Sequence, residues 1–486
     1  MTLELADGAL LRQAALIGGE WVPATALPAL AVTDPADGAL VGEVPDCGEA
    51  ETLAAISAAE AAWPAWRART ANERAALLEA WHALVLANVD DLARIMTAEQ
   101  GKPFAEAQGE IRYAATFIKW FAEEGRRVGA KNVASPERDR RIIVLTEPVG
   151  VSAAITPWNF PAAMITRKCA PALAAGCPVV IKPSDLTPFT ALALGELAVR
   201  AGFPSGTVNI VTGMPAAIGK AITESPVVRK LSFTGSTRVG SLLMRQCADT
   251  VKRMSLELGG NAPLIVFEDA DLDLAVQAAM ASKFRNAGQT CVCANRILVQ
   301  DSVYDEFAGR LGKAVGALNA APGMEAGATI GPLINAAAAE KASGHIEDAL
   351  ARGGAILATG QGRQGGNFVL PVIVGDATPD MRLAEEETFG PVAPLFRFGE
   401  EAEAIEMANA TPYGLASYFY TRDLSRAFRV AEALEAGMVA LNTGTIAMEM
   451  APFGGIKQSG LGREGGQAGI EEYLETKSFH IGGLEL

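Results

Sequence analysis

The stretch Val149-Gly-Val-Ser-Ala-Ala-Ile-Thr156 decides how this chain is expected to fold. It is a short apolar run with β-branched residues, and a helical pattern follows it over 162–175. A second apolar run, 179–182, and a second helical pattern, 187–201, come next. Strands that alternate with helices predict a parallel sheet covered by helices, and short apolar strands suit a sheet that is buried on both faces.

The alternation continues on both sides of this stretch. Further strands are predicted at 207–211 and 230–233, with a helix at 218–224 between them. A second series starts after Gly259-Gly260 and continues to about 442. Its first strands are predicted at 264–267 and 296–300, and its first helices at 272–286 and 303–318. Upstream, about 50–128 has a helical pattern and 140–145 a strand pattern, and the tail 469–481 begins helical and ends extended. The sequence therefore predicts an α/β protein.

The bulk composition excludes several classes of function. A chain of 486 residues suggests two or three domains, and its net charge of −15 disfavours a nucleic acid or an anionic membrane as partner. We find no signal-peptide pattern and no apolar run near the roughly 20 residues of a spanning helix, so a cytoplasmic location is expected. The six cysteines do not resemble a disulfide framework, and the three histidines lie too far apart to predict a metal site.

The sharpest local feature is Asn286-Ala-Gly-Gln-Thr-Cys-Val-Cys293, which follows a helical pattern and precedes a strand. Gly288 and Thr290 indicate a tight turn that would expose Cys291 to a substrate. A cysteine acts as a nucleophile through its thiolate, so it needs a base and an oxyanion donor nearby. The structural alternative for such a cysteine is a buried thiol with a packing role.

Two residues are candidates for these partners. Glu257 lies in Leu256-Glu-Leu-Gly-Gly260, where apolar neighbours would raise its pKa and let it take a proton near neutral pH. Asn159 follows the strand at 149–156, and an amide at the carboxyl end of a strand suits an oxyanion donor, worth roughly 3–4 kcal/mol. A salt-bridged carboxylate and an amide that caps its own turn are the respective alternatives.

The signals for a cofactor are weaker. No Gly-x-Gly-x-x-Gly follows a strand, so the usual dinucleotide fingerprint is absent. Phe233-Thr-Gly-Ser-Thr-Arg-Val-Gly240 opens a helix at a strand end, where Gly235 and Ser236 would meet a phosphate. Lys182-Pro-Ser-Asp185 ends another strand and offers a lysine and an acid to a ribose.

Taken together, these segments resemble the aldehyde dehydrogenase superfamily over essentially the whole chain. The matching motifs are TPWNFP (156–161), IKPS (181–184), FTGSTRVG (233–240), LELGG (256–260), GQTCVC (288–293), EETFGPV (386–392) and PFGGIKQSGLGRE (452–464). They occur in the order and with the spacing of that family. The combination is specific, although most of the motifs are weak alone.

The resemblance implies three structural parts. A Rossmann-like cofactor domain with a five-stranded sheet would comprise residues 1–125 and 149–257, and an α/β catalytic domain residues 258–456. A small β oligomerisation extension, 126–148 with 457–486, would pair between subunits. Such proteins are homodimers or homotetramers.

The resemblance also implies a mechanism. Cys291 would attack a small-molecule aldehyde, Asn159 and the Cys291 amide would hold the oxyanion, and Glu257 would activate water to release a carboxylic acid. Lys168 and Glu464 match positions that relay protons from Glu257. The residues expected to bind the cofactor are Thr156, Trp158, Lys182, Ser184, Asp185, Gly235, Ser236, Leu258, Glu387 and Phe389. Asp185 would repel a 2′-phosphate, so NAD is the expected cofactor and NADP the alternative.

Within the superfamily the chain is most similar to the succinate-semialdehyde dehydrogenases. Arg167 and Arg285 match two arginines that bind the distal carboxylate there, and Cys293 matches a thiol that forms a reversible disulfide with the nucleophile. A substrate-binding serine of that group is replaced by Ala447. A glutarate-semialdehyde or neutral-aldehyde dehydrogenase, a coenzyme A-acylating enzyme and a non-catalytic binding protein are the alternatives.

Overall fold

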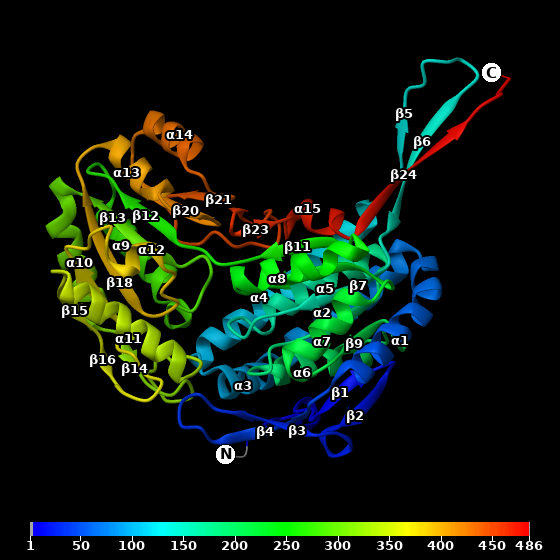
Figure 1. The fold of residues 1–486 in the computed structure, drawn as a ribbon, viewed down its shortest axis with the longest axis horizontal. Coiled ribbons are helices and arrows are strands. Elements are labelled where there is room, and N and C mark those ends of the chain that lie inside the picture. Colours follow the sequence, from blue (N-terminus) through cyan, green and yellow to red (C-terminus); the bar gives the residue numbers. More distant parts are fainter. Residues whose placement is uncertain (1–2, 486) are drawn as a thin grey trace.

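The computed structural model describes residues 3–485 and contains two large sheets (Figure 1). Strand β7 lies near the centre of the first large sheet. Five strands, in the order β9-β8-β7-β10-β11, are parallel. Antiparallel β1 and β2 extend one edge and antiparallel β23 the other, so the sheet has eight strands instead of the expected five. The strands are β1 (Ala14–Ile17), β2 (Glu20–Pro23), β7 (Val151–Ile155), β8 (Val179–Lys182), β9 (Val208–Ile210), β10 (Val228–Thr234), β11 (Arg253–Glu257) and β23 (Gly460–Leu461).

Helices cover both faces of this sheet because its central strands are apolar on both sides. Neighbouring residues of β7 enter different cores: Ala153 packs in the core below α1 and α7, and Ala154 in the core below α5 and α6. Helices α2, α3 and α4 form an outer layer on the α5 face. The helices are α1 (Glu49–Ala68), α2 (Ala71–Ala87), α3 (Val89–Gln100), α4 (Phe104–Glu124), α5 (Ala163–Ala175), α6 (Pro188–Arg200), α7 (Pro215–Glu224) and α8 (Thr237–Cys247).

The second unit contains a seven-stranded sheet with the order β15-β17-β18-β13-β12-β20-β21, in which only β15 is antiparallel to its neighbour. Its strands are β12 (Ala262–Val266), β13 (Ala294–Gln300), β15 (Ala355–Thr359), β17 (Val372–Gly375), β18 (Val392–Phe398), β20 (Ala416–Tyr420) and β21 (Met438–Leu441). Its helices are α9 (Leu272–Lys283), α10 (Tyr304–Gly316), α11 (Ala336–Ala351), α12 (Arg382–Glu385), α13 (Glu401–Asn409) and α14 (Leu424–Ala433).

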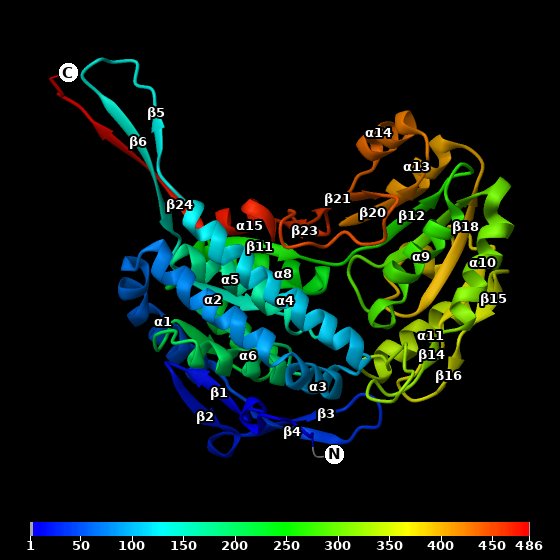
Figure 2. The ribbon, with the colours of Figure 1, turned by 180° about the vertical axis from the view of Figure 1, so that it is seen from behind.

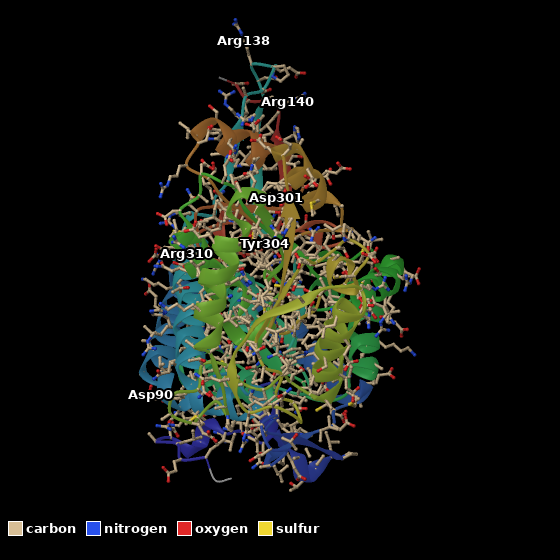
Figure 3. All side chains as sticks on the ribbon, turned by 90° about the vertical axis from the view of Figure 1, so that its left-hand side faces the viewer. Asp90, Arg138, Arg140, Asp301, Tyr304 and Arg310 are labelled. Carbon is tan, nitrogen blue, oxygen red and sulfur yellow. The ribbon has the colours of Figure 1, made fainter. Side chains whose placement is uncertain are left out.

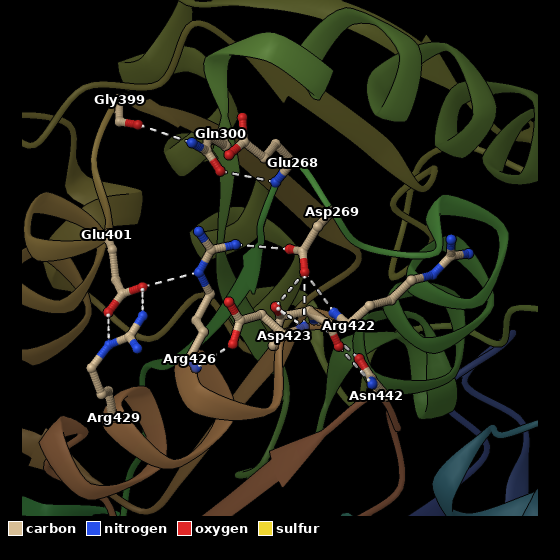
Figure 4. Close-up of polar contacts among 11 residues, drawn as sticks. Glu268, Asp269, Gln300, Gly399, Glu401, Arg422, Asp423, Arg426, Arg429 and Asn442 are labelled. Carbon is tan, nitrogen blue, oxygen red and sulfur yellow. Dashed lines mark hydrogen bonds and ion pairs between the residues drawn. The ribbon is translucent and has the colours of Figure 1, made fainter.

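A polar network fastens α14 to the end of this sheet (Figure 4). Asp269, which follows β12, accepts hydrogen bonds from the backbone amides of Arg422 and Asp423 at 2.8 and 3.0 Å. Its other oxygen pairs with Arg426 at 2.8 Å, and Arg426 also pairs with Glu401 at 2.9 Å. One carboxylate thereby holds the start of α14 in place.

An antiparallel arm projects from the first unit (Figure 2). It consists of β5 (Lys131–Val133), β6 (Arg141–Pro148) and β24 (Leu474–Ile481). Figure 3 shows Arg138 and Arg140 at its tip. Of the tail assigned to the extension from the sequence, 474–481 lies in the arm, whereas β23 pairs with β11 and α15 (Gly466–Glu471) packs on α5. The division into domains stays a prediction.

The segment 456–461 joins the two units. Its first half, β22 (Ile456–Lys457), pairs with β19 (Tyr413–Gly414) of the second unit, and its second half, β23, pairs with β11 of the first. Between them, the Ser459 hydroxyl donates to the Gly259 carbonyl at 2.7 Å and accepts from the Gly414 amide at 2.9 Å. The end of β11 is therefore fixed relative to the second sheet.

Two further pairs complete the strands, the hairpin β3 (Ala29–Thr33)–β4 (Leu40–Pro45) and the short parallel pair β14 (Asn319–Ala320)–β16 (Gln361–Gly362). Among the helices within residues 3–485, none has the length and apolar character needed to cross a bilayer. The cytoplasmic location expected from the sequence stays a prediction.

Candidate active site

Three chain segments meet between the two units. Asn159 follows β7, Glu257 is the last residue of β11, and Cys291 precedes β13. The Asn159 amide nitrogen donates to the Gln289 carbonyl at 2.9 Å, two residues before Cys291. A Cβ added to Gly260 would lie 2.4 Å from the Cys291 carbonyl, so the turn after Glu257 packs directly against the cysteine. The three residues selected from the sequence thus lie in one place.

The cysteine lies on a turn that the backbone makes with three left-handed residues. Helix α9 ends at Lys283 and not at 286, because Asn286 and Ala287 have φ of 52° and 55°. Gly288 follows with φ 75°, and a Cβ there would lie 2.2 Å from the Gly390 carbonyl. Such conformations cost roughly 1 kcal/mol or more per non-glycine residue and persist where the surroundings enforce them.

Cys291 is half-buried, whereas the five other cysteines are buried. Burial, with Glu387 and Glu257 nearby, raises the pKa of the Cys291 thiol to about 12. The resting group is therefore a neutral thiol, and a base has to take its proton before the sulfur attacks. This agrees with the expectation that the turn exposes Cys291 and that the site needs a carboxylate base.

Glu257 has the properties of such a base. It is 2% exposed, and neither of its carboxylate oxygens has a hydrogen-bond partner among the described residues. Burial and the neighbouring Glu464 raise its pKa well above that of an ordinary carboxyl group. A buried carboxylate without partners is costly, so its presence next to the thiol indicates a chemical role.

Behind Glu257 lies a buried ion-pair cluster. Lys168 on α5 pairs with Glu464 and donates to the Thr234 hydroxyl at 2.6 Å. Although burial opposes the charge, Lys168 and Arg167 lower the pKa of Glu464. The charges of Glu464, Lys168 and Arg167 act on Glu257, although no hydrogen bond joins Glu257 to them among the described residues. The proton relay expected from the sequence stays a prediction.

The two arginines expected to bind a substrate carboxylate lie in different environments. Arg167 is 2% exposed, its Nε is 3.2 Å from Glu464, and its guanidinium lies between the rings of Phe117 and Phe453. Arg285 is exposed, with its guanidinium carbon 5.1 Å from the ring centre of Phe160. Arg285 can meet a ligand that enters from solvent, whereas Arg167 is buried with its Nε and one terminal nitrogen without hydrogen-bond partners among the described residues. The role of both arginines in binding a substrate carboxylate stays a prediction.

A pocket of about 480 Å³ adjoins the cysteine. Thr290 and Val292, on either side of Cys291, contribute to its wall. Arg285 and Ala447 also line it, so the arginine and the position where the serine is missing face the same space. Glu106, from α4, places a carboxylate in the same wall.

The residues expected to bind a dinucleotide lie along the ends of β7, β8 and β10 and on the facing loop of the second unit. Ser236 caps α8 by accepting from the Val239 amide, and a Cβ on Gly235 would lie 2.5 Å from the Phe233 ring. Trp158 and Phe389 stack edge to face at 5.5 Å. The other expected cofactor residues lie at strand ends or in turns close to these four: Thr156, Lys182, Ser184, Asp185, Leu258 and Glu387.

Two of these residues are charged and poorly solvated. Lys182 is 3% exposed and lies 3.6 Å from Asp185, and burial lowers its pKa. Glu387 accepts from the Gly260 amide at 3.2 Å, and burial raises its pKa to about 7. Both suit hydroxyl groups of a ligand, because a ribose hydroxyl donates to one and accepts from the other.

Cys293 is fully buried, and its sulfur contacts the Lys283 carbonyl at 3.6 Å. The reversible disulfide with Cys291 stays a prediction. Among the described residues no group of histidine, cysteine and carboxylate side chains is arranged to hold a metal ion.

Sequence reasoning missed the polar side chains that support this site. Gln100, Lys102, Glu106 and Glu110 come from the end of α3 and the start of α4 and contact the segments around Asn159 and Asn286. A signal was present: polar residues recur through 99–110, where the structure buries most of them. Nothing in the sequence connects them to their partners, which lie 52 to 186 positions away.

Comparison with known proteins agrees with this geometry. The family model described as "Aldehyde dehydrogenase family" matches residues 21–479. The chain is 59% identical over 481 residues to succinate-semialdehyde dehydrogenase (NADP(+)) GabD of Escherichia coli (strain K12), covering 99% of this chain and 100% of that protein. It is 58% identical over 479 residues to glutarate-semialdehyde dehydrogenase of Pseudomonas putida, with 99% and 100% covered.

The fold matches as well. The solved structure of succinate-semialdehyde dehydrogenase from Burkholderia pseudomallei superposes with a TM-score of 0.97 at 58% identity, covering 99% of this chain and 100% of the other. Identity at this level over the whole length fixes both the fold and the family. The chain belongs to the aldehyde dehydrogenase family.

Proposed function

We propose that this protein oxidises a semialdehyde with a distal carboxylate to the corresponding dicarboxylic acid through a thioester on Cys291. The observation that carries the proposal is the position of Arg285, which lines a pocket together with Thr290 and Val292, the two neighbours of half-buried Cys291. A guanidinium forms paired hydrogen bonds with a carboxylate, so it would hold the acid end while the aldehyde end reaches the sulfur.

The protein's own groups account for the proton and charge movements. Glu257 takes the thiol proton as the Cys291 sulfur bonds to the aldehyde carbon, and the second N–H of the Asn159 amide faces the oxygen that becomes negative. Lys168 and Glu464 would first pass the thiol proton away from Glu257. After the carbon is oxidised, Glu257 takes a proton from water as the water oxygen attacks the thioester carbonyl. The carbon–sulfur bond breaks, the acid leaves, and the sulfur takes the proton that Glu257 gained from water.

A nicotinamide dinucleotide would supply the hydride acceptor when bound. The residues present fit this group, because the α8 N-terminus has no acidic residue in its first turn to repel a pyrophosphate. Lys182 would hold the adenosine ribose, and Glu387 the nicotinamide ribose. Trp158 and Phe389 would border the nicotinamide ring.

Retention of every one of these groups disfavours the other readings of the sequence. A binding protein without catalysis would have no use for an unpartnered buried carboxylate at 257 next to a thiol. Glu257 also provides a base for water, which makes water a better acyl acceptor than coenzyme A. Product analysis with and without coenzyme A distinguishes these two acceptors.

The choice between succinate and glutarate semialdehyde depends on Ala447. A methyl group there offers no hydrogen bond to a substrate carboxylate and occupies less space than a serine side chain. The neighbouring Met448 and Met450 are exposed and adaptable. We therefore propose that the pocket accepts both succinate semialdehyde and glutarate semialdehyde. Glutarate semialdehyde or a neutral aldehyde is the alternative to succinate semialdehyde as the main substrate.

Replacement of Arg285 by alanine is expected to lower kcat/KM for succinate and glutarate semialdehydes by about 100-fold, because the bound carboxylate loses its counter-charge. A neutral aldehyde of similar length is expected to change by less than about three-fold. Steady-state kinetics on the three aldehydes measures both values. Arg363→Ala, which removes an exposed arginine near Phe368, is the matched control. Equal losses for acidic and neutral aldehydes would show that Arg285 does not read the carboxylate.

For the cofactor we propose NAD in preference to NADP. Asp185 is half-exposed beside Lys182, where its charge would repel a 2′-phosphate. Asp185→Asn is expected to raise kcat/KM with NADP by about ten-fold and to leave that with NAD within about three-fold. The surface variant Asp249→Asn serves as control. A wild-type enzyme that already prefers NADP, like the relative with NADP(+) in its name, would refute the preference.

We also propose that the chain assembles as a homodimer or homotetramer through the arm. In the isolated chain the arm strands β5 and β24 are largely exposed, including Val133 and Phe479, and such apolar edges favour pairing with another subunit. Light scattering would show two or four chains per particle, and a monomer would contradict the proposal.

A further inference from the structure

Four polar side chains with no part in the chemistry above lie directly behind it. Gln100, Lys102 and Glu110 are each at most 5% exposed, and Glu106 is partly buried in the pocket wall. They lie within eleven residues of each other, at the end of α3 and in the first turns of α4. We refer to these four side chains as the polar clamp.

One half of the clamp holds the segment that carries Asn159. The Lys102 ammonium donates to the Asn159 carbonyl at 2.8 Å and pairs with Glu110. Glu110 in turn accepts from the backbone amides of Ala162 and Ala163, at 2.9 and 3.3 Å, just at the start of α5. The backbone from the Asn159 carbonyl to the start of α5 is therefore fixed by one buried ion pair.

The other half holds the turn that leads to Cys291. Glu106 accepts from the Asn286 backbone amide at 2.8 Å, and the Gln100 amide donates to the Asn286 side-chain oxygen at 3.0 Å. Asn286 is the first of the three residues with positive φ in this turn. These two contacts therefore stabilise a backbone conformation that is uncommon for residues other than glycine. They act on its backbone and on its side chain at once.

Asn286 joins the two halves. Its side-chain nitrogen donates to the Asn159 carbonyl at 2.9 Å and to the Gln289 carbonyl at 3.3 Å. The Gln289 carbonyl also accepts from the Asn159 amide at 2.9 Å, which uses one of that amide's two N–H groups and directs the other. Gln289 is itself fixed, because its side-chain oxygen accepts from the Ile334 amide at 2.9 Å.

We propose that Gln100, Lys102, Glu106 and Glu110 are positioning residues that set the distance and direction between the Asn159 amide and the Cys291 sulfur. The inference rests on the proposed function, in which these two groups act on the same carbonyl. Catalytic groups have to be held to about 0.5 Å, and a displacement of about 1 Å costs up to 100-fold in rate. The clamp supplies this precision from one segment, because it bonds to both loops.

The test is a double-mutant cycle between Gln100 and Asn159. Gln100→Leu removes the donor to Asn286 at nearly constant volume, and kcat is expected to fall about 30-fold with KM within about three-fold. Asn159→Ala is expected to lower kcat by about 100-fold or more. Since Gln100 acts through the placement of Asn159, the double variant is expected to match Asn159→Ala within about three-fold. Multiplied losses, or a folded Gln100→Leu enzyme with wild-type kcat, would overturn the proposal.

Three further variants guard against loss of folding. Gln108→Leu makes the same change on α4, where the Gln108 side chain donates to Asp90 at the surface, and wild-type kinetics are expected. Glu106→Gln keeps an oxygen acceptor for the Asn286 amide and is expected to retain kcat within about five-fold, whereas Glu106→Leu is expected to lose about 30-fold. Equal kcat in these two Glu106 variants would also contradict the clamp. A wild-type enzyme that oxidises none of the aldehydes would instead refute the proposed function itself, and the inference with it.

Discussion

Cys291→Ala is expected to lower kcat for aldehyde oxidation by about 10⁴-fold or more, because no covalent intermediate forms without the sulfur. The reaction then loses its route through two easier steps. Steady-state production of NADH or NADPH from succinate and glutarate semialdehydes measures the effect. The melting temperature should stay close to that of the wild type, since Cys291 is half-buried and an alanine fits its place.

The natural control is the second cysteine of the same turn. Cys293→Ala removes a buried thiol two residues away whose sulfur donates a hydrogen bond to the Lys283 carbonyl. We expect it to retain kcat within about three-fold, with a small loss of stability of about 1 kcal/mol for the cavity. If Cys291→Ala were active and Cys293→Ala inactive, Cys293 would be the nucleophile, and the assignment of Cys291 would be refuted.

Glu257→Gln is expected to stop the cycle after oxidation. Its kcat should fall by about 10³-fold, since a positioned base contributes roughly 10²–10⁴. The first turnover should still yield reduced cofactor as a burst of up to one equivalent per site, with attack by Cys291 made slower by the missing base. Rapid-mixing absorbance measures the burst. Absence of any burst, together with full binding of substrate, would mean that Glu257 is needed only for attack and not for hydrolysis.

The pH profile of the same enzyme provides a separate check. Burial and Glu464 raise the pKa of Glu257, so the carboxylate form that acts as base is gained only as the pH rises through that raised value. The activity of the wild type is therefore expected to increase with pH above the normal range of a carboxyl group. In Glu257→Gln this limb should disappear, because an amide does not titrate.

The buried strands of the fold were predictable because they are short, apolar and bounded by glycine or proline. β8 has the predicted bounds, 179–182, and β7 and β10 differ by a few residues. The strands at 14–45 had no such signal. β2 has the burial pattern of an edge strand, with no buried residue on either face. β3 and β4 form a half-exposed hairpin. Their pairing depends on neighbours distant in the sequence.

The candidate residues of the site could be named from the sequence, whereas the side chains that support them could not. Cys291, Glu257 and Asn159 lie at turns and strand ends, which are local features, but the family resemblance selected them over the structural alternatives. Their catalytic roles stay predictions. The early end of α9 at Lys283 was not predicted, since the left-handed Asn286 is held by Glu106, 180 residues earlier. Nor does a helical pattern show which way Arg167 points. Its partner Glu464 is almost 300 residues away, and only the fold brings them within 3.2 Å.

The most direct test of the account is the mass of Glu257→Gln after reaction with succinate semialdehyde and cofactor, followed by peptide mapping. We expect the protein to gain one succinyl group, located on Cys291 and removed by hydroxylamine. An unmodified Cys291 in an enzyme that has reduced one equivalent of cofactor, or an acyl group on another residue, would contradict the proposed mechanism.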